Sequence, residues 1–145
     1  MNQSFLINLS FLLEKPTGTT VYSKQLLPYT KKLSPVIITP QQIENYQCIQ
    51  VPNNKTAQKG LKGHISRLLW TQFQLPQLYQ ELKTNLLFSP IPEAPLYSKC
   101  RYIVTVHDLI QLRFPKKISP FFRFYLPQVL QQAEHIICNS QATAD

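Results

Sequence analysis

The stretch Tyr102-Ile103-Val104-Thr105-Val106-His107-Asp108 decides the fold of this chain. Its first five residues are almost continuously apolar or β-branched, a pattern typical of a strand that is buried on both faces. Such strands belong to parallel sheets that carry helices on both sides. The strand is expected to end at His107-Asp108, which places an imidazole and a carboxylate at the sheet edge where ligands gather in open parallel sheets.

Other short apolar runs predict further strands, and they alternate with segments of helical periodicity. The expected strands cover residues 5–9, 36–39, 48–51, 86–88 and 135–138. The expected helices cover residues 19–33, 64–83 and 119–134, the second kinked or divided at Pro76 because proline removes a backbone donor. Residues 53–63 have the composition of a solvated loop. The alternation predicts an α/β protein with a doubly wound parallel sheet.

The composition fits one globular domain, with 145 residues of which 43% are hydrophobic and 15% charged. The three cysteines are odd in number and far apart, which argues against a disulfide framework and a zinc site and fits a reducing cytoplasm. No apolar run reaches the roughly 18 residues of a membrane-spanning helix, so we expect none. A net charge of +8 favours anionic partners without choosing among them.

Two places at the ligand-binding edge are candidates for chemistry. The first is the turn that contains Thr17 and Gly18, where a glycine at the start of a helix would let a phosphate come close to the backbone. The alternative is that Gly18 is an ordinary turn residue, which is the commoner role of a single glycine. The second is His107 with Asp108; the alternative is that both serve only the structure of the following loop. Arg113, with Lys116 and Lys117 behind it, is a secondary phosphate candidate.

A basic segment precedes apolar and aromatic residues in the middle of the chain. Lys55, Lys59, Lys62 and Arg67 lead into a segment with Trp70 and Phe73, so this helix could rest on an anionic membrane surface. At helical spacing, however, Trp70 and Phe73 more often belong to a core. Cys100 lies between two basic residues, Lys99 and Arg101, a setting that favours some thiol reactivity.

The chain resembles the N-terminal half of the bacterial family 4 glycosyltransferases of the GT-B architecture over essentially all of its length. The most specific stretches are Val104-Thr105-Val106-His107-Asp108-Leu109-Ile110, followed by Leu112-Arg113-Phe114-Pro115, and Ala133-Glu134-His135-Ile136-Ile137-Cys138-Asn139-Ser140. Where relatives carry a loop with several glycines, this chain keeps Gly18 and the aromatic Tyr22. The resemblance implies a Rossmann-like domain that holds the acceptor, facing a second domain that holds the donor.

The resemblance also implies a function and site residues. The parent protein would transfer a sugar, with retention at the anomeric carbon, from a nucleotide-sugar donor to a glycan or lipid-linked acceptor in polysaccharide biosynthesis, without a bound metal or other cofactor. His107 would contact the transferred sugar, Gly18 with Thr17 would let the donor diphosphate approach, and Asp108 with Arg113 would shape the cleft. The protein is expected in the cytoplasm, with peripheral contact to the inner membrane face.

Residues 1–145 would then be the acceptor-side domain of a truncated protein. The helix expected to begin at Ser140 has barely one turn of sequence, and the paired glutamates of the family's donor domain have no counterpart in this sequence. The isolated chain would be inactive. One alternative is a non-catalytic remnant or interaction domain with an exposed apolar surface. Another is a basic nucleic-acid-binding module, which ranks lower because no recognised motif is present, so we expect no nucleic-acid partner.

Overall fold

The computed structural model describes residues 4–11, 18–51, 60–106 and 124–138. In these ranges six strands form one sheet with the order β3-β2-β1-β4-β5-β6, and every neighbouring pair is parallel. The strands are β1 (Ser4–Asn8), β2 (Val36–Thr39), β3 (Gln47–Gln50), β4 (Thr84–Ser89), β5 (Tyr102–Val106) and β6 (His135–Cys138). This strand order is that of a doubly wound Rossmann-like sheet, so the predicted fold class is confirmed.

The chain winds outward from β1 in two directions. It first adds β2 and β3 on one side of β1, then returns and adds β4, β5 and β6 on the other side. The direction of winding therefore changes between β1 and β4, whose register pairs Leu6 with Leu87 and Ile7 with Phe88. In open α/β sheets, the crevice at such a switch point is the usual position of a ligand.

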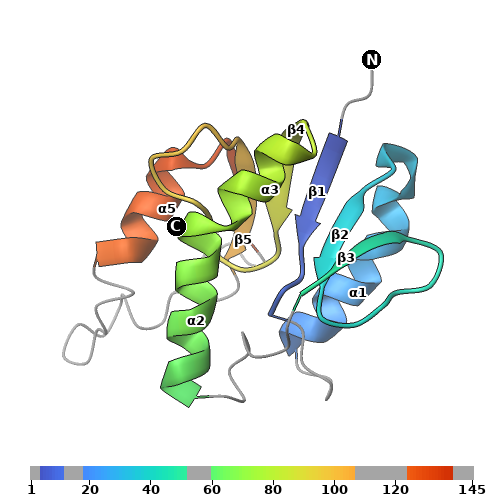
Figure 1. Cartoon of the computed structure of the whole chain (residues 1–145), viewed down its shortest axis with the longest axis horizontal. Coiled ribbons are helices and arrows are strands. Elements are labelled where there is room, and N and C mark those ends of the chain that lie inside the picture. The colour runs from blue at the N-terminus through green and yellow to red at the C-terminus, as the bar shows by residue number, and fades with distance from the viewer. Residues whose placement is uncertain (1–3, 12–17, 52–59, 107–123, 139–145) are drawn as a thin grey trace.

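Alternating residues of the strands build a separate core on each face of the sheet. One core holds Leu6, Leu87, Val104 and their neighbours together with residues of the helices α2 (Gly60–Phe73), α3 (Leu75–Glu81) and α5 (Leu126–Gln132). The opposite core contains Ile7 and Phe88 against helix α1 (Gly18–Thr30). In Figure 1, α2 and α3 lie in front of the sheet and α1 behind it. This two-sided burial explains why β1, β2 and β5 are apolar runs without polar alternation.

The helices begin and end where the sequence changes character. A short 3₁₀ helix (Lys31–Leu33) continues α1 and ends at Ser34, whose φ of 49° breaks the helical path. The predicted division near Pro76 is confirmed, because α2 ends at Phe73 and Pro76 occupies the first turn of α3, where its missing N–H costs no hydrogen bond. Pro127 has the same place in α5, which ends one residue before the extended Ala133.

Several predicted details were wrong. Residues 60–63 belong to helix α2 and not to a solvated loop. Trp70 is buried in the core as expected, but Phe73 is 68% exposed.

The predicted start of the helix at residue 119 lies outside the described residues, as does Ser140. None of the helices in the described ranges is both long and apolar enough to cross a bilayer.

Candidate functional site

The carboxyl ends of the strands meet at one edge of the sheet, and polar residues concentrate there at the switch point. Asn8 ends β1 and Ser89 ends β4, and the register brings them level, one position beyond the pair Ile7 and Phe88. Asn8 is 1% exposed and Ser89 is fully buried. Two buried polar side chains on neighbouring strand ends at the switch point mark a position where the fold could bind a ligand.

A side-chain hydrogen bond terminates β1. The backbone N–H of Ser10 donates to Oδ1 of Asn8 over 3.1 Å, which makes an Asx turn, while the N–H of Leu9 donates to the carbonyl of Ile38 over 2.7 Å. Asn8 therefore diverts the chain from the strand direction toward the segment that leads to α1. The turn is buried, so its geometry is held by the surrounding core.

Two hydroxyl groups at this edge are buried without a hydrogen-bond partner in the described part of the chain. They belong to Ser10, just beyond β1, and Ser89, the last residue of β4. A buried hydroxyl group without a partner costs free energy on folding, so each one calls for an explanation; the described ranges hold two others, Thr71 in α2 and Thr84 at the start of β4. Their position on both sides of the switch point makes this edge the candidate binding site.

Helix α1 contacts the end of β5 through side chains. The phenol oxygen of Tyr22 and Oγ1 of Thr105 lie 3.1 Å apart, within hydrogen-bond distance. Tyr22 is in the second turn of the helix that begins at Gly18, and Thr105 is the penultimate residue of β5 and fully buried. This contact links the start of α1 to the strand end that precedes His107.

The connection from β4 to β5 is held at the same edge by charged and polar contacts. Nε of Arg67, on α2, lies 3.0 Å from each carboxylate oxygen of Glu93, and both side chains are largely buried. Further along, the phenol of Tyr125 donates to the carbonyl of Ala94 and accepts a hydrogen bond from Nε2 of Gln72, each over 2.8 Å. Arg67 is therefore neutralised inside the protein and is not available to anionic lipid, contrary to one sequence interpretation.

Burial shifts the pKa values of several groups on this side of the sheet. It raises the pKa of Tyr102 to about 12, and the phenol donates to the carbonyl of Val129 over 2.6 Å. Burial and then the charge of Glu93 raise the pKa of Tyr125 as well. Burial also raises the pKa of the Cys100 thiol against the weaker opposing effect of a hydrogen bond with Ser98. A raised pKa leaves a smaller fraction of Cys100 as thiolate at neutral pH, so Cys100 is less reactive than the sequence predicted.

Most of the predicted site residues fall outside the described part of the chain. This is so for Thr17, His107, Asp108 and Arg113, and for the secondary candidates Lys116 and Lys117. Gly18 is described, and it is the first residue of α1. Within the ranges that the structure describes, no three His, Cys, Asp or Glu residues are grouped so as to hold a metal ion.

Sequence reasoning missed the buried polar residues of the edge. Asn8 and Ser10 interrupt the first apolar run, and this interruption was the available signal for a polar strand end. Ser89 closes β4 directly before Pro90, a position that looks like an ordinary strand border. The pairing of Arg67 with Glu93, 26 residues apart, has no local signal in the sequence.

Comparison with known proteins gives a family. Neither the curated proteins nor the solved structures contain a significant match to this chain. A sequence profile of glycosyltransferase family 4, by contrast, matches residues 18–145, which span α1 and the strands from β2 to β6 but neither β1 nor Ser10. The chain therefore belongs to glycosyltransferase family 4.

Proposed function

We propose that this chain is the acceptor-side domain of a retaining glycosyltransferase of the GT-B architecture. Family membership supports glycosyl transfer in general. In this proposal a sugar moves from a nucleotide-sugar donor to a glycan or lipid-linked acceptor, as a step of polysaccharide biosynthesis in a bacterial cytoplasm. The chain supplies one wall of the cleft, and a donor-binding domain supplies the other.

The observation that carries the proposal is the meeting of α1 and β5 at the switch-point edge. The Tyr22–Thr105 contact brings the start of α1, at Gly18, to the end of β5. His107 follows β5 directly in the sequence. An anionic diphosphate is favoured at a helix start, and an imidazole suits a sugar hydroxyl, so both parts of a nucleotide sugar find partners at one edge.

Each site residue has a distinct role in this proposal. His107 contacts the transferred sugar, and Gly18 with Thr17 lets the diphosphate come close to the backbone of α1. Asp108 and Arg113 shape the cleft. Glycosyl transfer develops positive charge on the sugar and negative charge on the departing diphosphate, and the donor domain contributes most of the groups that stabilise the latter. By likeness to the family, the transfer uses no bound metal or other cofactor.

The test is an assay of nucleotide-sugar turnover with this chain joined to a family 4 donor-binding domain. His107→Ala is expected to lower kcat at least about a hundredfold, as for loss of a group that acts in the transition state. The matched control is His135→Ala, because His135 is an exposed residue at the start of β6, at the opposite end of the strand from the carboxyl edge. Equal turnover by the two variants would remove His107 from the mechanism.

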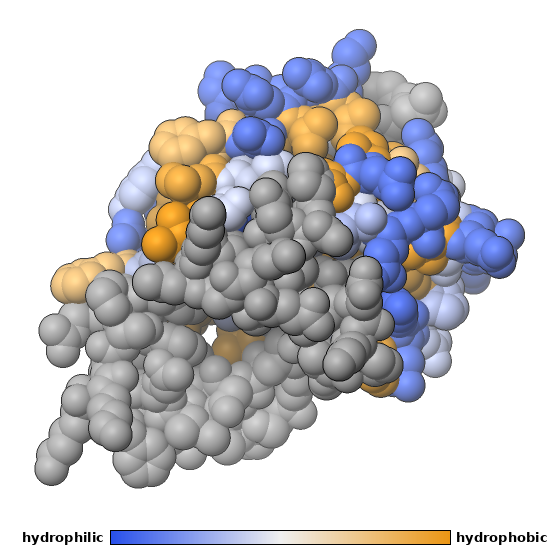
Figure 2. Space-filling view, turned by 60° about the horizontal axis from the view of Figure 1, so that its bottom comes forward, coloured by the Kyte–Doolittle hydropathy of each residue, from blue (hydrophilic) through white to orange (hydrophobic). Residues whose placement is uncertain are grey.

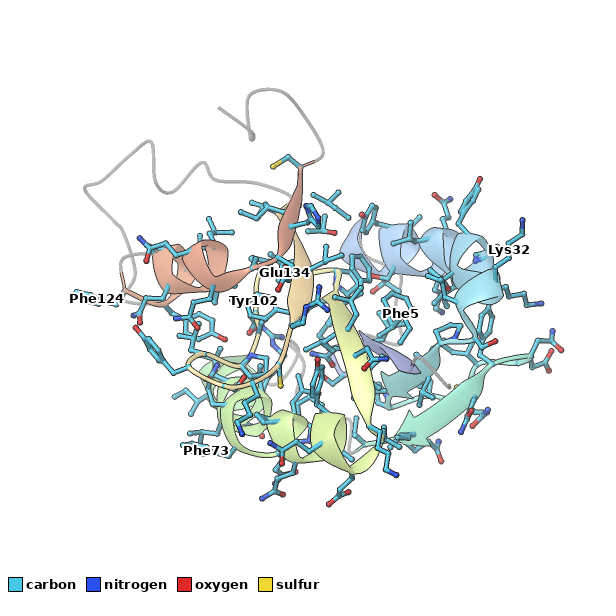
Figure 3. All side chains as sticks on the ribbon, turned by 90° about the horizontal axis from the view of Figure 1, so that it is seen from above. Phe5, Lys32, Phe73, Tyr102, Phe124 and Glu134 are labelled. Atoms are coloured by element: carbon cyan, nitrogen blue, oxygen red, sulfur yellow. The ribbon has the colours of Figure 1, made fainter. Side chains whose placement is uncertain are left out.

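The outer face of α2 supports contact with a membrane. Ile65, Leu69 and Phe73 follow one another every four residues and are 47%, 54% and 68% exposed, so they form an apolar stripe. Figure 3 shows Phe73 directed away from the sheet, and Figure 2 shows apolar side chains at the surface on one flank of the molecule. A net charge of +8 favours an anionic surface. The proposal places this stripe on the membrane that carries a lipid-linked acceptor.

Sedimentation with phosphatidylglycerol vesicles tests the membrane contact. Leu69→Ser with Phe73→Ser is expected to weaken binding about tenfold or more, because two apolar side chains leave the interface. Tyr29→Ser is the matched control, since Tyr29 is an exposed aromatic residue on α1 across the sheet. If the double variant sediments like the parent chain, or if vesicles of neutral lipid bind equally, the stripe does not serve an anionic membrane.

A further inference from the structure

A pocket of about 340 Å³ opens between α1 and the segment that connects β2 to β3. It lies on the α1 side of the sheet, and its size falls in the range of small-molecule sites. The buried side chain of Leu27 and the half-buried side chains of Ile43 and Tyr46 supply its apolar lining. Lys24, Gln41, Gln42 and Glu44 supply its polar groups.

The connecting segment has a defined shape without any ligand. Oγ1 of Thr39 donates to the carbonyl of Gln41 over 2.8 Å and accepts from the N–H of the same residue over 3.1 Å. The backbone of Asn45 adopts a φ of 70°, a left-handed conformation that asparagine tolerates. The thiol of Cys48 lies within hydrogen-bond distance of the carbonyls of Ile43 and Tyr46. A pre-formed pocket loses less conformational freedom on binding.

The aromatic ring of the pocket is also held in place. Nζ of Lys31 lies 5.5 Å from the centroid of the Tyr46 ring, a cation–π distance. Tyr46 and Ile43 also pack against the core on the α1 face of the sheet. Both contacts restrain the ring at the side of the pocket.

The chemistry of the lining selects a ligand class. Among the lining residues, Lys24 and Glu44 are one cation and one anion, so their formal charges balance, while Lys31 stands beside the lining, over the Tyr46 ring. The amides of Gln41 and Gln42 each combine donors and an acceptor, which is what neighbouring hydroxyl groups require. Nε2 of Gln42 also donates to the carbonyl of Ile43 over 3.4 Å, which leaves its second N–H and its oxygen for a ligand. An aromatic ring with aliphatic neighbours matches the C–H faces of a pyranose ring. A phosphate or carboxylate would instead call for an excess of cations.

We propose that this pocket binds one neutral sugar unit of a glycan. Lys24 lies six residues after Gly18 on α1, or about 9 Å along the helix axis, so the pocket is separate from the start of the helix. The sugar binding itself stands on the pocket alone. That the bound sugar belongs to the acceptor rests on the proposed function.

The experiment is a titration of the isotope-labelled 145-residue chain, followed by the amide resonances in NMR. Methyl glucoside and N-acetylglucosamine are the neutral probes, and glucuronate and inorganic phosphate are the anionic ones. The neutral probes are expected to shift the resonances of residues 41–46 and of Lys24. Gln42→Ala is expected to weaken binding about tenfold by removing hydrogen bonds to the sugar.

One control variant, matched to Gln42→Ala, keeps the result decisive. Gln42 and Gln77 are both exposed glutamines, but Gln77 is on α3 across the sheet, so Gln77→Ala is expected to bind the probes like the parent chain. Both substitutions are at the surface and leave the core intact. The proposal is overturned if no neutral sugar shifts residues 41–46, if Gln42→Ala binds unchanged, or if the anionic probes bind there more tightly. Because no nucleotide sugar is used, failure here is distinct from failure of the transfer reaction.

Discussion

Tyr22 and Thr105 join α1 to β5 across 83 residues of sequence through hydroxyl groups 3.1 Å apart. Thr105 is fully buried, and the preceding residue Val104 packs in the opposite core, so Thr105 faces α1. A buried threonine in this strand is explained by its partner on the covering helix. The contact fixes the helix start relative to the strand end.

A double-mutant cycle measures the Tyr22–Thr105 contact. Tyr22→Phe and Thr105→Val each remove one hydroxyl group, and their free energies of unfolding in urea are compared with that of the double variant. We expect a coupling free energy of about 0.5 to 1.5 kcal/mol, the net value of a buried hydrogen bond. Strictly additive effects of the two substitutions would contradict the contact.

The Arg67–Glu93 pair is expected to be sensitive to loss of one partner. Glu93→Ala removes the Glu93 carboxylate from a largely buried guanidinium group and is expected to cost roughly 3 kcal/mol of stability. The exposed pair of Arg101 and Glu134 is the matched control, where Glu134→Ala is expected to cost at most about 0.5 kcal/mol because solvent screens the charges. If Glu93→Ala and Glu134→Ala lost the same free energy of unfolding in chemical denaturation, solvent would screen the Arg67–Glu93 pair as well.

Alkaline pH is expected to destabilise the fold through Tyr102. Its folded-state pKa of about 12 lies above the ordinary value of 10, so its contribution is complete below pH 10 and is lost as the pH rises toward 12. Thermal unfolding between pH 9 and pH 12 measures the effect. In Tyr102→Phe this part of the pH dependence should be absent, and an unchanged slope would assign it to other groups.

Two aromatic residues three positions apart on α2 are expected to differ in their effect on stability. Trp70 is 5% exposed and packs in the core, so Trp70→Ala is expected to cost about 3 to 5 kcal/mol. Phe73→Ala removes a side chain that is mostly in solvent and should stay within about 0.5 kcal/mol of the parent chain. If the two variants unfolded at similar urea concentrations, the two side chains would be equally buried, which would contradict the structure.

The sequence was enough to predict the sheet and its winding. β2, β5 and β6 have the predicted bounds, and the other strands differ by one or two residues at their ends. Continuous apolar strands are a strong signal because a parallel sheet buries both faces. Phe73 was harder to place, because helical periodicity identifies an apolar stripe but does not say whether another element covers it.

The candidate site was only partly predictable. The positions of Gly18 and of the end of β5 follow from local signals, a turn residue and a β-branched run. The buried hydroxyl groups of Ser10 and Ser89 become meaningful only once β1 and β4 are neighbours, and their order in the sheet is a tertiary property. The roles of Thr17, His107, Asp108 and Arg113 stay predictions.

The central place of β1 has a consequence for synthesis on the ribosome. β1 pairs with β2 about 30 residues later, Leu6 with Val36, but its other neighbour begins only with the pair Ser4 and Thr84, 80 residues apart. At typical translation rates of roughly 5 to 20 residues per second, β1 waits about 4 to 16 s for that second neighbour. During this time its far edge is open to wrong pairing, so chaperone dependence should concentrate in this interval.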